Sequence, residues 1–401
     1  MRILVVSSKY HPEYSGSGYR AHNSYKRFNK NFSISFDVVS SSLESKGVKK
    51  YVYDGVNIVR ISGVFLPIKF TGFFQKIIIW LNLPFEFFQC WLFIKKKIGQ
   101  YDVLHTFGNS WAVGFMTWYF AKYKKPIIRE LCNDIPSPYY PKRFKRWISP
   151  IFKRENTMVV AISPMLEMMA KSHGVRNIWQ RPNPVNESNF SVKNINIKNK
   201  LRRSISKFDK SDVIMTSVAN FSQRKNQLFL LKVLRRLPKK YKLLLVGVIQ
   251  NDNEGGRTGK KILLSSDYVD TIKNYIEMYD LESRVQLVTK FVENPHDYMT
   301  LSDVYLFPSL HEGLGTPILE AQSCGIPIVA NDLPGITDVW IKEGVAGYFA
   351  PLNSDLWAAK IKEAIEIKRD ILINNSNYIL SKASSSVIDK KYFEIFNKLT
   401  R

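Results

Sequence analysis

The stretch from His311 to Gly335, HEGLGTPILEAQSCGIPIVANDLPG, narrows the possible folds more than any other part of this chain. It follows an apolar run at 304–307 that is typical of a buried parallel strand. A glycine-rich turn comes next, and then a segment from Ile318 with helical spacing that stops at Gly325. Strand, glycine turn and helix in this order predict a unit of a doubly wound α/β sheet.

Two carboxylates, Glu312 and Glu320, stand eight residues apart around this turn. The first N–H groups of a helix have no intrahelical partner, and the helix dipole adds partial positive charge, so a diphosphate can dock there. Glycines let it come close, and carboxylates can hold sugar or ribose hydroxyls. The alternative is that the glutamates are only a turn residue and an acid near a helix start. The predicted nucleotide-sugar site comprises Glu312, Gly313, Leu314, Gly315, Thr316 and Glu320.

The chain of 401 residues is too long for one ordinary core, so we expect two domains of about 200 residues each. Its cysteines, Cys90, Cys132 and Cys324, are far apart and lack metal-ligand spacing, which implies neither a disulfide framework nor a zinc site. The first apolar run, 3–6, is too short for a signal peptide and lacks a small-residue cleavage site. We therefore expect a cytoplasmic protein.

Short apolar runs alternate with longer segments of helical spacing in two series, which predicts two doubly wound, Rossmann-like α/β domains. Between the series, 185–209 is polar, rich in Asn, Ser and Lys, and weakly periodic, as interdomain connections are. We predict a first, acceptor-binding domain at 1–187, a linker at 188–209 and a second, nucleotide-sugar-binding domain at 210–384, with a C-terminal helix at about 385–401 that can pack back onto the first domain. The predicted strands are 3–6, 35–39, 56–61, 103–106, 126–128, 158–162, 213–218, 243–246, 285–287, 304–307 and 328–330.

Ligands of doubly wound domains bind outside the carboxyl ends of the strands, so glycines and charges at strand exits are candidate binding groups. After the first strand, Gly16 and Gly18 precede a helix expected near Ala21 and could approach a phosphate, although a flexible loop explains them as well. After the first strand of the second series, Arg224 and Lys225 form a cationic pair that could neutralise a diphosphate leaving group. A solvated charge at a helix start is the alternative for Arg224.

Together these segments resemble the family 4 retaining glycosyltransferases (glycosyl transferases group 1), which have the two-domain GT-B fold. The resemblance is carried by the glutamate pair, by 308–309 before it (Pro-Ser), and by 324–327 (Cys-Gly-Ile-Pro) and 331–335 (Asn-Asp-Leu-Pro-Gly) after it. It covers nearly the whole chain and is strongest at 213–352. It implies two Rossmann-like domains that face each other across a deep cleft.

The resemblance also implies roles for residues outside the opening stretch. Lys225 matches a family lysine that binds the donor diphosphate, whereas Asn220 stands where an arginine is usual, so that Arg224 could substitute. Gly247 corresponds to a strand-plus-glycine segment near the nucleotide base. The glycine pair of the first loop corresponds to a family loop that contacts the donor phosphate or the acceptor.

The first domain offers less clear catalytic candidates. His105 ends a strand in a segment that recurs in the family, but a lone histidine at a strand end is as often a structural residue. Family members commonly carry another histidine at the next strand exit, where this chain has Cys132 and then Asp134. The candidate catalytic residues are therefore Glu312, His105 and Asp134.

The implied activity is retaining transfer of a hexose or related sugar from a UDP- or GDP-sugar to a saccharide or lipid-linked saccharide. The implied context is bacterial cell-surface polysaccharide synthesis: O-antigen, capsule or lipopolysaccharide. The chain has neither Asp-x-Asp, the diphosphate-metal motif of the other main glycosyltransferase fold, nor a phosphate loop. We therefore expect no obligatory metal, no cofactor and no nucleotide hydrolysis. A nucleotide-sugar epimerase or a phosphorylase on the same fold is the alternative.

Charge is distributed unevenly along the chain. Residues 1–250 carry 43 Lys and Arg against 13 Asp and Glu, whereas 251–401 carry 16 against 21. This asymmetry predicts an anionic partner for the first part, such as an anionic membrane surface or a phosphorylated acceptor, although a compositional bias towards lysine explains it too. Nucleic acid is not the expected partner, because the chain lacks a recognised binding module and its aromatic residues cluster with aliphatic ones.

The segment 65–97 is unusually rich in Phe, Trp and Ile, but polar residues and a proline interrupt it, so we predict no spanning helix. We expect helices partly in the core, with aromatic residues at a membrane interface and the lysines at 95–97 on anionic headgroups. A second basic-aromatic cluster at 142–147 favours the same peripheral protein on the inner face of the cytoplasmic membrane, whereas ordinary buried helices are the alternative. The interrupting residues are Asn82, Pro84, Glu86 and Gln89.

Overall fold

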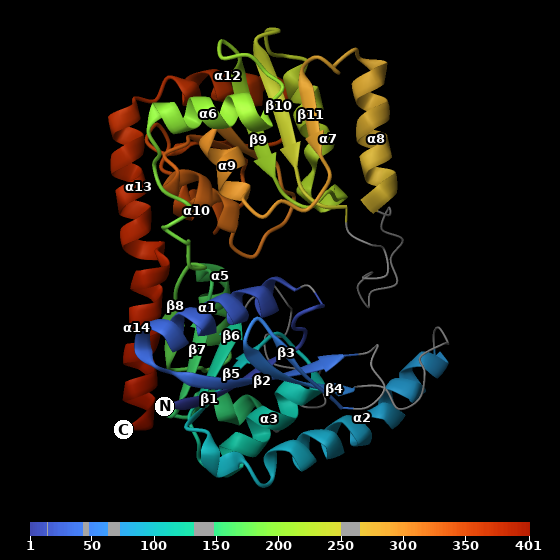
Figure 1. Cartoon of the computed structure of the whole chain (residues 1–401), viewed down its shortest axis with the longest axis vertical. Helices are drawn as coiled ribbons and strands as arrows, with labels where there is room; N and C mark the ends of the chain where they lie inside the picture. Colours follow the sequence, from blue (N-terminus) through green and yellow to red (C-terminus); the bar gives the residue numbers. More distant parts are fainter. Residues whose placement is uncertain (14, 43–47, 63–72, 132–147, 250–264) are drawn as a thin grey trace. The chain divides into compact units, whose positions relative to one another are not determined.

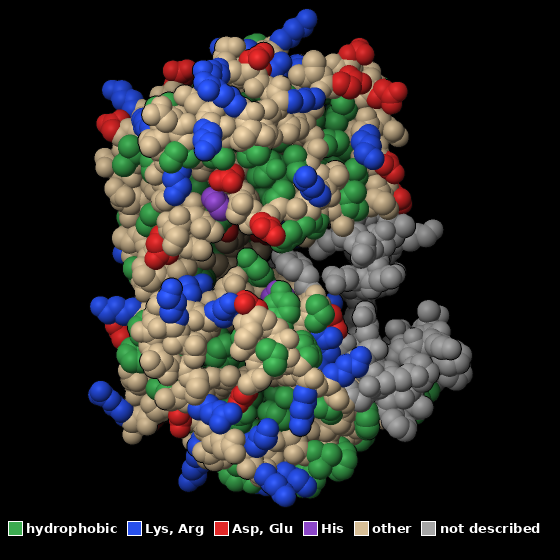
Figure 2. Space-filling model, viewed as in Figure 1, with side chains coloured by type: hydrophobic (Ala, Val, Ile, Leu, Met, Phe, Trp, Pro, Cys, Tyr) green, Lys and Arg blue, Asp and Glu red, His purple; other side chains and the backbone are tan. Residues whose placement is uncertain are grey.

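The computed structural model of the chain describes residues 1–401 except 14, 43–47, 63–72, 132–147 and 250–264. The described residues form two compact units (Figure 1). Unit 1 comprises Met1–Arg181 and Ser386–Arg401, and unit 2 comprises Pro182–Ser385. The visible face of each unit carries basic and acidic side chains among small hydrophobic groups (Figure 2). Of the helices that the structure describes, none is long and apolar enough to cross a membrane.

Unit 1 contains an eight-stranded sheet with the order β3-β4-β2-β1-β5-β6-β7-β8. Strand β3 is antiparallel to β4, and the other neighbouring strands are parallel. Residues of β5 and β6 are buried throughout, as expected for parallel strands that helices cover on both faces. The strands are β1 (Arg2–Ser7), β2 (Ser35–Ser42), β3 (Lys49–Tyr53), β4 (Val56–Ser62), β5 (Val103–Phe107), β6 (Ile127–Leu131), β7 (Thr157–Ala161) and β8 (Ile178–Gln180).

The first and last helices of the chain pack on the same face of this sheet. Ile3 and Val5 of β1 share a core with Tyr25 of α1 and with Tyr392 and Phe396 of α14. The end of the chain therefore belongs to unit 1 although it follows unit 2. The helices of unit 1 are α1 (Gly16–Phe32), α2 (Phe73–Ile94), α3 (Trp111–Lys122), α5 (Pro164–Ser172) and α14 (Ser385–Thr400), with 3-10 turns at Ile98–Gln100 and Ser149–Lys153.

Unit 2 contains a six-stranded parallel sheet with the order β11-β10-β9-β12-β13-β14. Its strands are β9 (Val213–Val218), β10 (Tyr241–Val246), β11 (Val285–Val288), β12 (Val304–Phe307), β13 (Ile328–Asn331) and β14 (Gly347–Ala350). Its helices are α6 (Ile195–Ile205), α7 (Gln227–Leu234), α8 (Ser265–Met278), α9 (Pro295–Thr300), α10 (Thr316–Ser323), α11 (Thr337–Trp340), α12 (Ser354–Ile365) and α13 (Arg369–Ala383), with a 3-10 turn at Gln223–Lys225.

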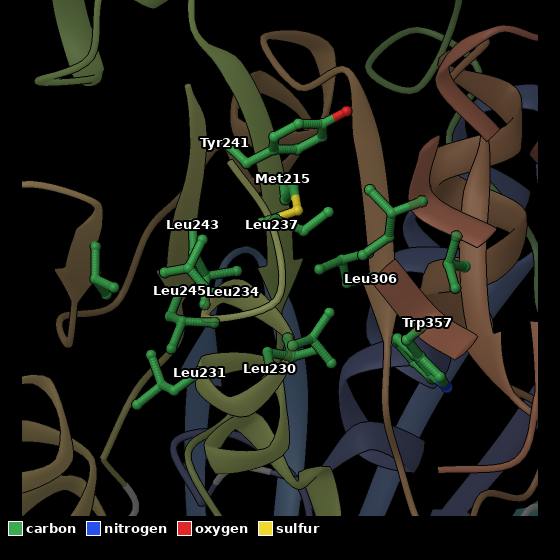
Figure 3. Packing of buried hydrophobic residues seen from close by; sticks show 14 of the residues in the cluster. Met215, Leu230, Leu231, Leu234, Leu237, Tyr241, Leu243, Leu245, Leu306 and Trp357 are labelled. Atoms are coloured by element: carbon green, nitrogen blue, oxygen red, sulfur yellow. The ribbon is translucent and has the colours of Figure 1, made fainter. Parts of the chain in front are cut away.

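The core of unit 2 fixes the strand exits on which its candidate site stands. Met215 of β9 and Leu243 of β10 pack against Leu230 and Leu234 of α7, and Trp357 of α12 closes the cluster (Figure 3). All of these side chains are fully buried. Large-to-small changes in such a core typically cost about 2–5 kcal/mol, so the sheet edge is a firm support for the loops that follow.

Each predicted strand is present, within a few residues of its predicted bounds. The sequence did not predict β3, β8 or β14, because they are short or polar and carry little apolar signal. Each sheet has the strand order of a doubly wound fold, with a reversal beside β1 and beside β9. Ligands of such sheets bind at the carboxyl ends of the strands at this reversal.

The predicted linker at 188–209 is corrected by helix α6, which belongs to unit 2. Asn194 caps this helix by accepting a hydrogen bond from the N–H of Ile197 (2.9 Å). Buried Arg202 then donates to the carbonyl of Leu301 (2.8 Å) and pairs with Asp303 (2.5 Å). Polar contacts hold this helix in place, so its apolar periodicity is weak. The sequence analysis therefore did not predict it.

Candidate functional site

The exits of β9 and β12 bring two of the predicted motifs together. These strands are neighbours in the sheet of unit 2, so the loops after them start side by side. The N–H of Leu310 donates to the carbonyl of Arg224 (2.8 Å), and the side-chain amide of Asn226 donates to the carbonyl of Pro308 (3.3 Å). The cationic pair after β9 and the glutamate after β12 are therefore held next to each other.

Glu312 lies between the two cations. Lys225 Nζ donates a hydrogen bond to Glu312 Oε1, and Arg224 Nη1 lies 3.1 Å from the same oxygen. Burial pushes the pKa of Glu312 upward, but the charges of Lys225 and Arg224 outweigh burial, so the net pKa is lowered. Glu312 is thus an anion at neutral pH, and its second oxygen can accept a hydrogen bond from a ligand.

Lys225 keeps unused donors. Its side chain is only 12% exposed, and burial lowers its pKa, partly offset by Glu312. Among the described residues, Glu312 is its single hydrogen-bond partner, so the remaining N–H groups of the ammonium are open to a ligand. Arg224 is about half exposed and also donates to the carbonyl of His311 (2.8 Å), which fixes the loop rather than leaving the guanidinium free.

Glu320 lies on α10, and its side-chain carboxyl group forms no hydrogen bond or ion pair with any described residue. Burial raises its pKa to about 7, against an ordinary value of 4.5. The nearby Lys225 charge opposes this rise without cancelling it. At neutral pH the carboxyl group is therefore about half protonated and can accept a hydrogen bond from a ligand hydroxyl.

The turn before α10 offers backbone donors. Gly315 caps the helix in the left-handed region (φ 74°) without a side-chain cap. No described group accepts from the N–H groups of 313–316. Buried Leu314 anchors the turn, and Thr316 Oγ1 accepts a hydrogen bond from the side-chain amide of Asn183 (2.8 Å). Free amides at a helix start form an anion site, which agrees with the predicted diphosphate position.

Gly247 and Asn220 support the loop after β9. A Cβ atom on Gly247 would lie 1.9 Å from the carbonyl oxygen of Ala219, so only glycine permits this close backbone approach. The carbonyl of Asn220 accepts a hydrogen bond from the side chain of Gln227 (3.0 Å). The structure thus explains the glycine by backbone packing, whereas its predicted place near the nucleotide base stays a prediction.

The glycine loop of unit 1 differs from the prediction. Helix α1 begins at Gly16, before the expected start at Ala21. The N–H of Gly18 donates to Ser15 Oγ (3.0 Å), and a Cβ atom on Gly18 would lie 2.6 Å from the carbonyl oxygen of Lys9. Gly18 is therefore a close-packing residue whose N–H is already used, which corrects its assignment as a phosphate ligand. The space around Gly16 is open apart from the side chain of Arg20.

His105 is likewise enclosed by its own unit. Its Nδ1 shares a hydrogen bond with the hydroxyl of Tyr25 (2.7 Å), and its Nε2 with Glu130 Oε1 (3.1 Å). Burial lowers the pKa of His105 despite the Glu130 carboxylate beside it. Both ring nitrogens are occupied and the side chain is buried, so the structure corrects the catalytic assignment of His105 to a structural one.

A buried ion pair extends this cluster. Arg181 Nη2 pairs with Glu130 Oε2 (2.8 Å), and Tyr392 of α14 donates its hydroxyl hydrogen to Glu130. Arg181 Nε in turn donates to Tyr392 (3.0 Å). Burial raises the pKa of Glu130, but the Arg181 charge and these hydrogen bonds outweigh burial and lower it. The cluster therefore connects α14 to the sheet. The remaining catalytic candidate, Asp134, lies outside the described residues.

The sequence did not single out the side chains that hold the two loops of unit 2. Asn226 has a left-handed backbone (φ 55°), a conformation that asparagine tolerates, and its position directly before a helix is the signal that could have revealed it. Asn183 lies in an Arg-Pro-Asn-Pro run that constrains the backbone but does not show that it reaches Thr316. No cluster of three or more His, Cys, Asp or Glu side chains suited to a metal occurs in the part of the chain that the structure describes.

Comparisons with known proteins bear on the family and the fold of the chain. Residues 198–378 match the family described as glycosyl transferases group 1. The capsular polysaccharide biosynthesis glycosyltransferase CapH of Staphylococcus aureus is 30% identical over 194 residues, which are 47% of this chain and 47% of CapH. The O-antigen biosynthesis glycosyltransferase WclY of Escherichia coli is 25% identical over 122 residues, 30% of this chain and 29% of WclY. The chain thus matches about half or less of the length of these curated relatives.

Solved structures resemble the chain over nearly its whole length. HepE of Anabaena, crystallised with UDP and glucose, has a TM-score of 0.71 at 17% identity, over 99% of this chain and 100% of HepE. Sucrose-phosphate synthase of Thermosynechococcus elongatus has a TM-score of 0.74 at 17% identity, over 99% of this chain and 98% of that protein. These likenesses confirm the predicted fold, GT-B with two Rossmann-like α/β domains.

Proposed function

Because residues 198–378 match the family described as glycosyl transferases group 1, we propose that this chain is a retaining glycosyltransferase. It transfers a hexose or related sugar from a UDP- or GDP-sugar to a saccharide or lipid-linked saccharide in bacterial surface polysaccharide synthesis. The names of the relatives CapH and WclY support this context. The observation that carries the proposal is the set of unused donors, Lys225 Nζ and the amides of 313–316, around one ionised carboxylate.

In this proposal each group at the β9 and β12 exits has one task. Lys225 and the amides before α10 hold the diphosphate and neutralise the charge that develops as it leaves. Glu312 accepts hydrogen bonds from the transferred sugar, and Glu320 accepts one from the ribose. The acceptor hydroxyl attacks on the face that the diphosphate leaves, so the configuration is retained without a protein nucleophile. Lys225 and the amides supply positive charge to the diphosphate, so we propose metal-independent transfer.

The test begins with a thermal-shift screen of nucleotide sugars to identify the donor. Transfer of that sugar to membrane extracts is then measured for the wild type and for Glu312→Gln and Glu320→Gln. We expect each variant to lose about 10²-fold in rate, by analogy with the loss of one charge-stabilising group. Wild-type rates in both variants would refute the site. Conversion of the nucleotide sugar to its epimer without an acceptor would favour an epimerase instead, and formation of a sugar 1-phosphate from a saccharide and phosphate would favour a phosphorylase.

Helix α2 buries polar side chains and exposes apolar ones, the opposite of an ordinary amphipathic helix on the surface of a globular protein. Its polar Asn82, Glu86 and Gln89 are buried, whereas Phe88 and Leu92 are about half exposed. The three polar residues that interrupt the apolar segment therefore point into the protein, whereas Pro84 is exposed. The carboxylate of Glu86 accepts from the N–H of Ala112 at the start of α3 (3.0 Å), and the side chain of Gln89 bonds the backbone of β4 at Ser62. Further exposed apolar side chains on α2 and α3 are Ile77, Leu81, Trp91 and Trp118.

Basic side chains stand beside these exposed rings. Lys95 Nζ lies 3.9 Å from the ring centroid of Trp91, and Lys122 Nζ lies 5.8 Å from that of Trp118. An exposed apolar face bordered by lysines matches the headgroup and acyl boundary of an anionic membrane. We therefore propose that α2 and α3 hold the enzyme on the inner face of the cytoplasmic membrane, near a lipid-linked acceptor. The second basic-aromatic cluster, 142–147, lies outside the described residues.

Vesicle co-sedimentation tests this surface. The wild type should bind vesicles that contain phosphatidylglycerol and should bind pure phosphatidylcholine weakly. The double variant Phe88→Ser with Leu92→Ser should lose most of the binding, roughly tenfold or more for two exposed apolar side chains. Tyr378→Ser removes a comparably exposed side chain from α13 and is the matched control. Equal binding by both variants would rule out α2 as the membrane contact.

A further inference from the structure

Unit 2 contains a cavity at the amino ends of its strands, whereas the candidate donor site lies at their carboxyl ends. This cavity has a volume of about 350 Å³. It is lined by Val213 at the start of β9, by Asp303 just before β12 and by Pro327 just before β13. The donor site stands at the carboxyl ends of the same strands, so the two places are distinct.

The cavity wall is basic. Lys193, Lys198 and Arg369 line it, and Asp303 is the acid among its lining residues. Asp303 is already paired, since its carboxylate accepts from Lys198 Nζ (2.9 Å) and contacts Arg202 (2.5 Å). The acid therefore neutralises no further cation in the wall.

Lys193 and Arg369 have no acidic partner among the described residues. Lys193 Nζ donates to Ser191 Oγ (2.8 Å) and keeps further N–H groups, while Arg369 donates to the carbonyl of Lys193 (3.1 Å). Thr300 Oγ1, in a residue that is 5% exposed, has no nitrogen or oxygen partner in the described part of the chain and has only the weak thiol of Cys324 beside it. Unpaired donors gathered in one wall are what a dianion would satisfy.

The other walls are apolar. Ile326, Ile365 and Leu372 line them, together with Val192. Helix α13 starts at the cavity without a side-chain cap. Its first N–H groups therefore have neither an intrahelical acceptor nor a capping side chain. A volume of this size falls within the range of small-ligand pockets.

We propose that this cavity binds an organic phosphate monoester with a short apolar body. The phosphate is held by Lys193 and Arg369, with Lys198 and the hydroxyl of Thr300 at its side. The apolar body lies against the isoleucine and leucine walls. Two negative charges match the two cations that lack an acid. This site is independent of sugar transfer, and α10, about 12 Å long, separates it from the donor turn.

Hexyl phosphate is a suitable probe, titrated calorimetrically into the full chain. We expect saturable binding that is about tenfold tighter than that of inorganic phosphate or hexanol. Inorganic phosphate lacks the apolar body, and hexanol lacks the phosphate. Lys193→Gln and Arg369→Gln should each weaken it about tenfold, the effect of one charge-assisted hydrogen bond. Lys200→Gln removes an exposed lysine of α6 outside the cavity and should change nothing.

The titration is repeated with the nucleotide sugar found in the donor screen. Unchanged hexyl phosphate binding places it outside the donor turn, as proposed. Competition with the nucleotide sugar, equal binding by wild type and both variants, or no saturation would overturn the proposal. Because binding is measured without transfer, the cavity can be tested even if the proposed enzyme activity fails.

Discussion

Each unit places a carboxylate beside a cation near its sheet, yet the two clusters differ in how completely they are satisfied. In unit 1, Glu130 receives bonds from His105, Arg181 and Tyr392, and every one of these partners belongs to the same unit. In unit 2, the Lys225 ammonium has unused N–H groups, and the side-chain carboxyl group of Glu320 has no hydrogen-bond partner among the described residues. The closed cluster has its hydrogen-bonding groups satisfied within the unit, whereas the open one keeps groups that the proposed ligand would satisfy.

The free-energy consequences differ in the same way. Removal of one member from a closed buried pair leaves an uncompensated charge, which is strongly destabilising. Removal of Lys225 from the open cluster takes away binding capacity but should cost less folding free energy, because Arg224 Nη1 remains 3.1 Å from Glu312 and still pairs with it. Substitutions in the two clusters should therefore separate stability from affinity.

The largest effect is expected for Arg181→Met, which leaves the Glu130 carboxylate buried beside His105 and Tyr392. We expect a loss of about 3–5 kcal/mol in the free energy of unfolding, because an unpaired buried charge remains. Urea unfolding followed by circular dichroism measures it. Tyr392→Phe removes one hydrogen bond but no charge and should cost only about 1–2 kcal/mol. Equal losses in the two variants would mean that the ion pair is not the stabilising feature.

A smaller change in free energy, seen in affinity rather than stability, is expected for Lys225→Met. The methionine fills a similar volume but cannot bind a diphosphate, so the affinity for the donor should fall about 10²-fold, the effect of one or two charge-assisted hydrogen bonds. Isothermal titration with the donor identified in the screen measures it. Arg224→Gln, at a half-exposed position, should lose less than tenfold. A drop in unfolding free energy as large as that of Arg181→Met, at unchanged affinity, would contradict the distinction between the clusters.

The contrast also shows what the sequence could reveal. The strands and the donor turn depend on local patterns, namely apolar runs and a glycine turn between two glutamates, so their positions were predicted within a few residues. The fate of His105 depends on Tyr25, which is 80 residues away, and on Glu130. Nothing near His105 in the sequence indicates that both ring nitrogens are occupied.

Helix α2 shows a second limit of the same kind. Glu86 and Gln89 resemble part of a solvent face in the sequence, but they are bonded to α3 and to β4 inside the protein. Periodicity shows that a helix has two faces and not which one is buried. The sequence therefore did not show which side chains of this segment are exposed, and its contact with a membrane stays a proposal.

The smallest effect is a pH dependence at Glu320. The native carboxyl holds its proton up to about pH 7, whereas in the unfolded chain it ionises near its ordinary value of 4.5. Between these values the native state binds more protons, so this group lowers the stability of the wild type as pH rises through the window. Glutamine cannot ionise and escapes this loss. Glu320→Gln should therefore match the wild type below pH 4.5 and be more stable than the wild type at pH 8.

Urea unfolding at both pH values measures this difference, and a difference that does not change with pH would contradict the assignment of the proton to Glu320. Donor binding should show the opposite trend. A ribose hydroxyl that donates to the carboxylate favours the ionised form, so wild-type affinity for the nucleotide sugar should rise from pH 6 to pH 8 and stay flat in Glu320→Gln. The nucleotide sugar itself does not titrate in this range, since each phosphorus of its diphosphate diester carries one strongly acidic group that is already ionised. Glu320 should thus destabilise the fold as it ionises and strengthen donor binding in the same pH range. This behaviour separates the open cluster from Glu130, whose pKa is lowered.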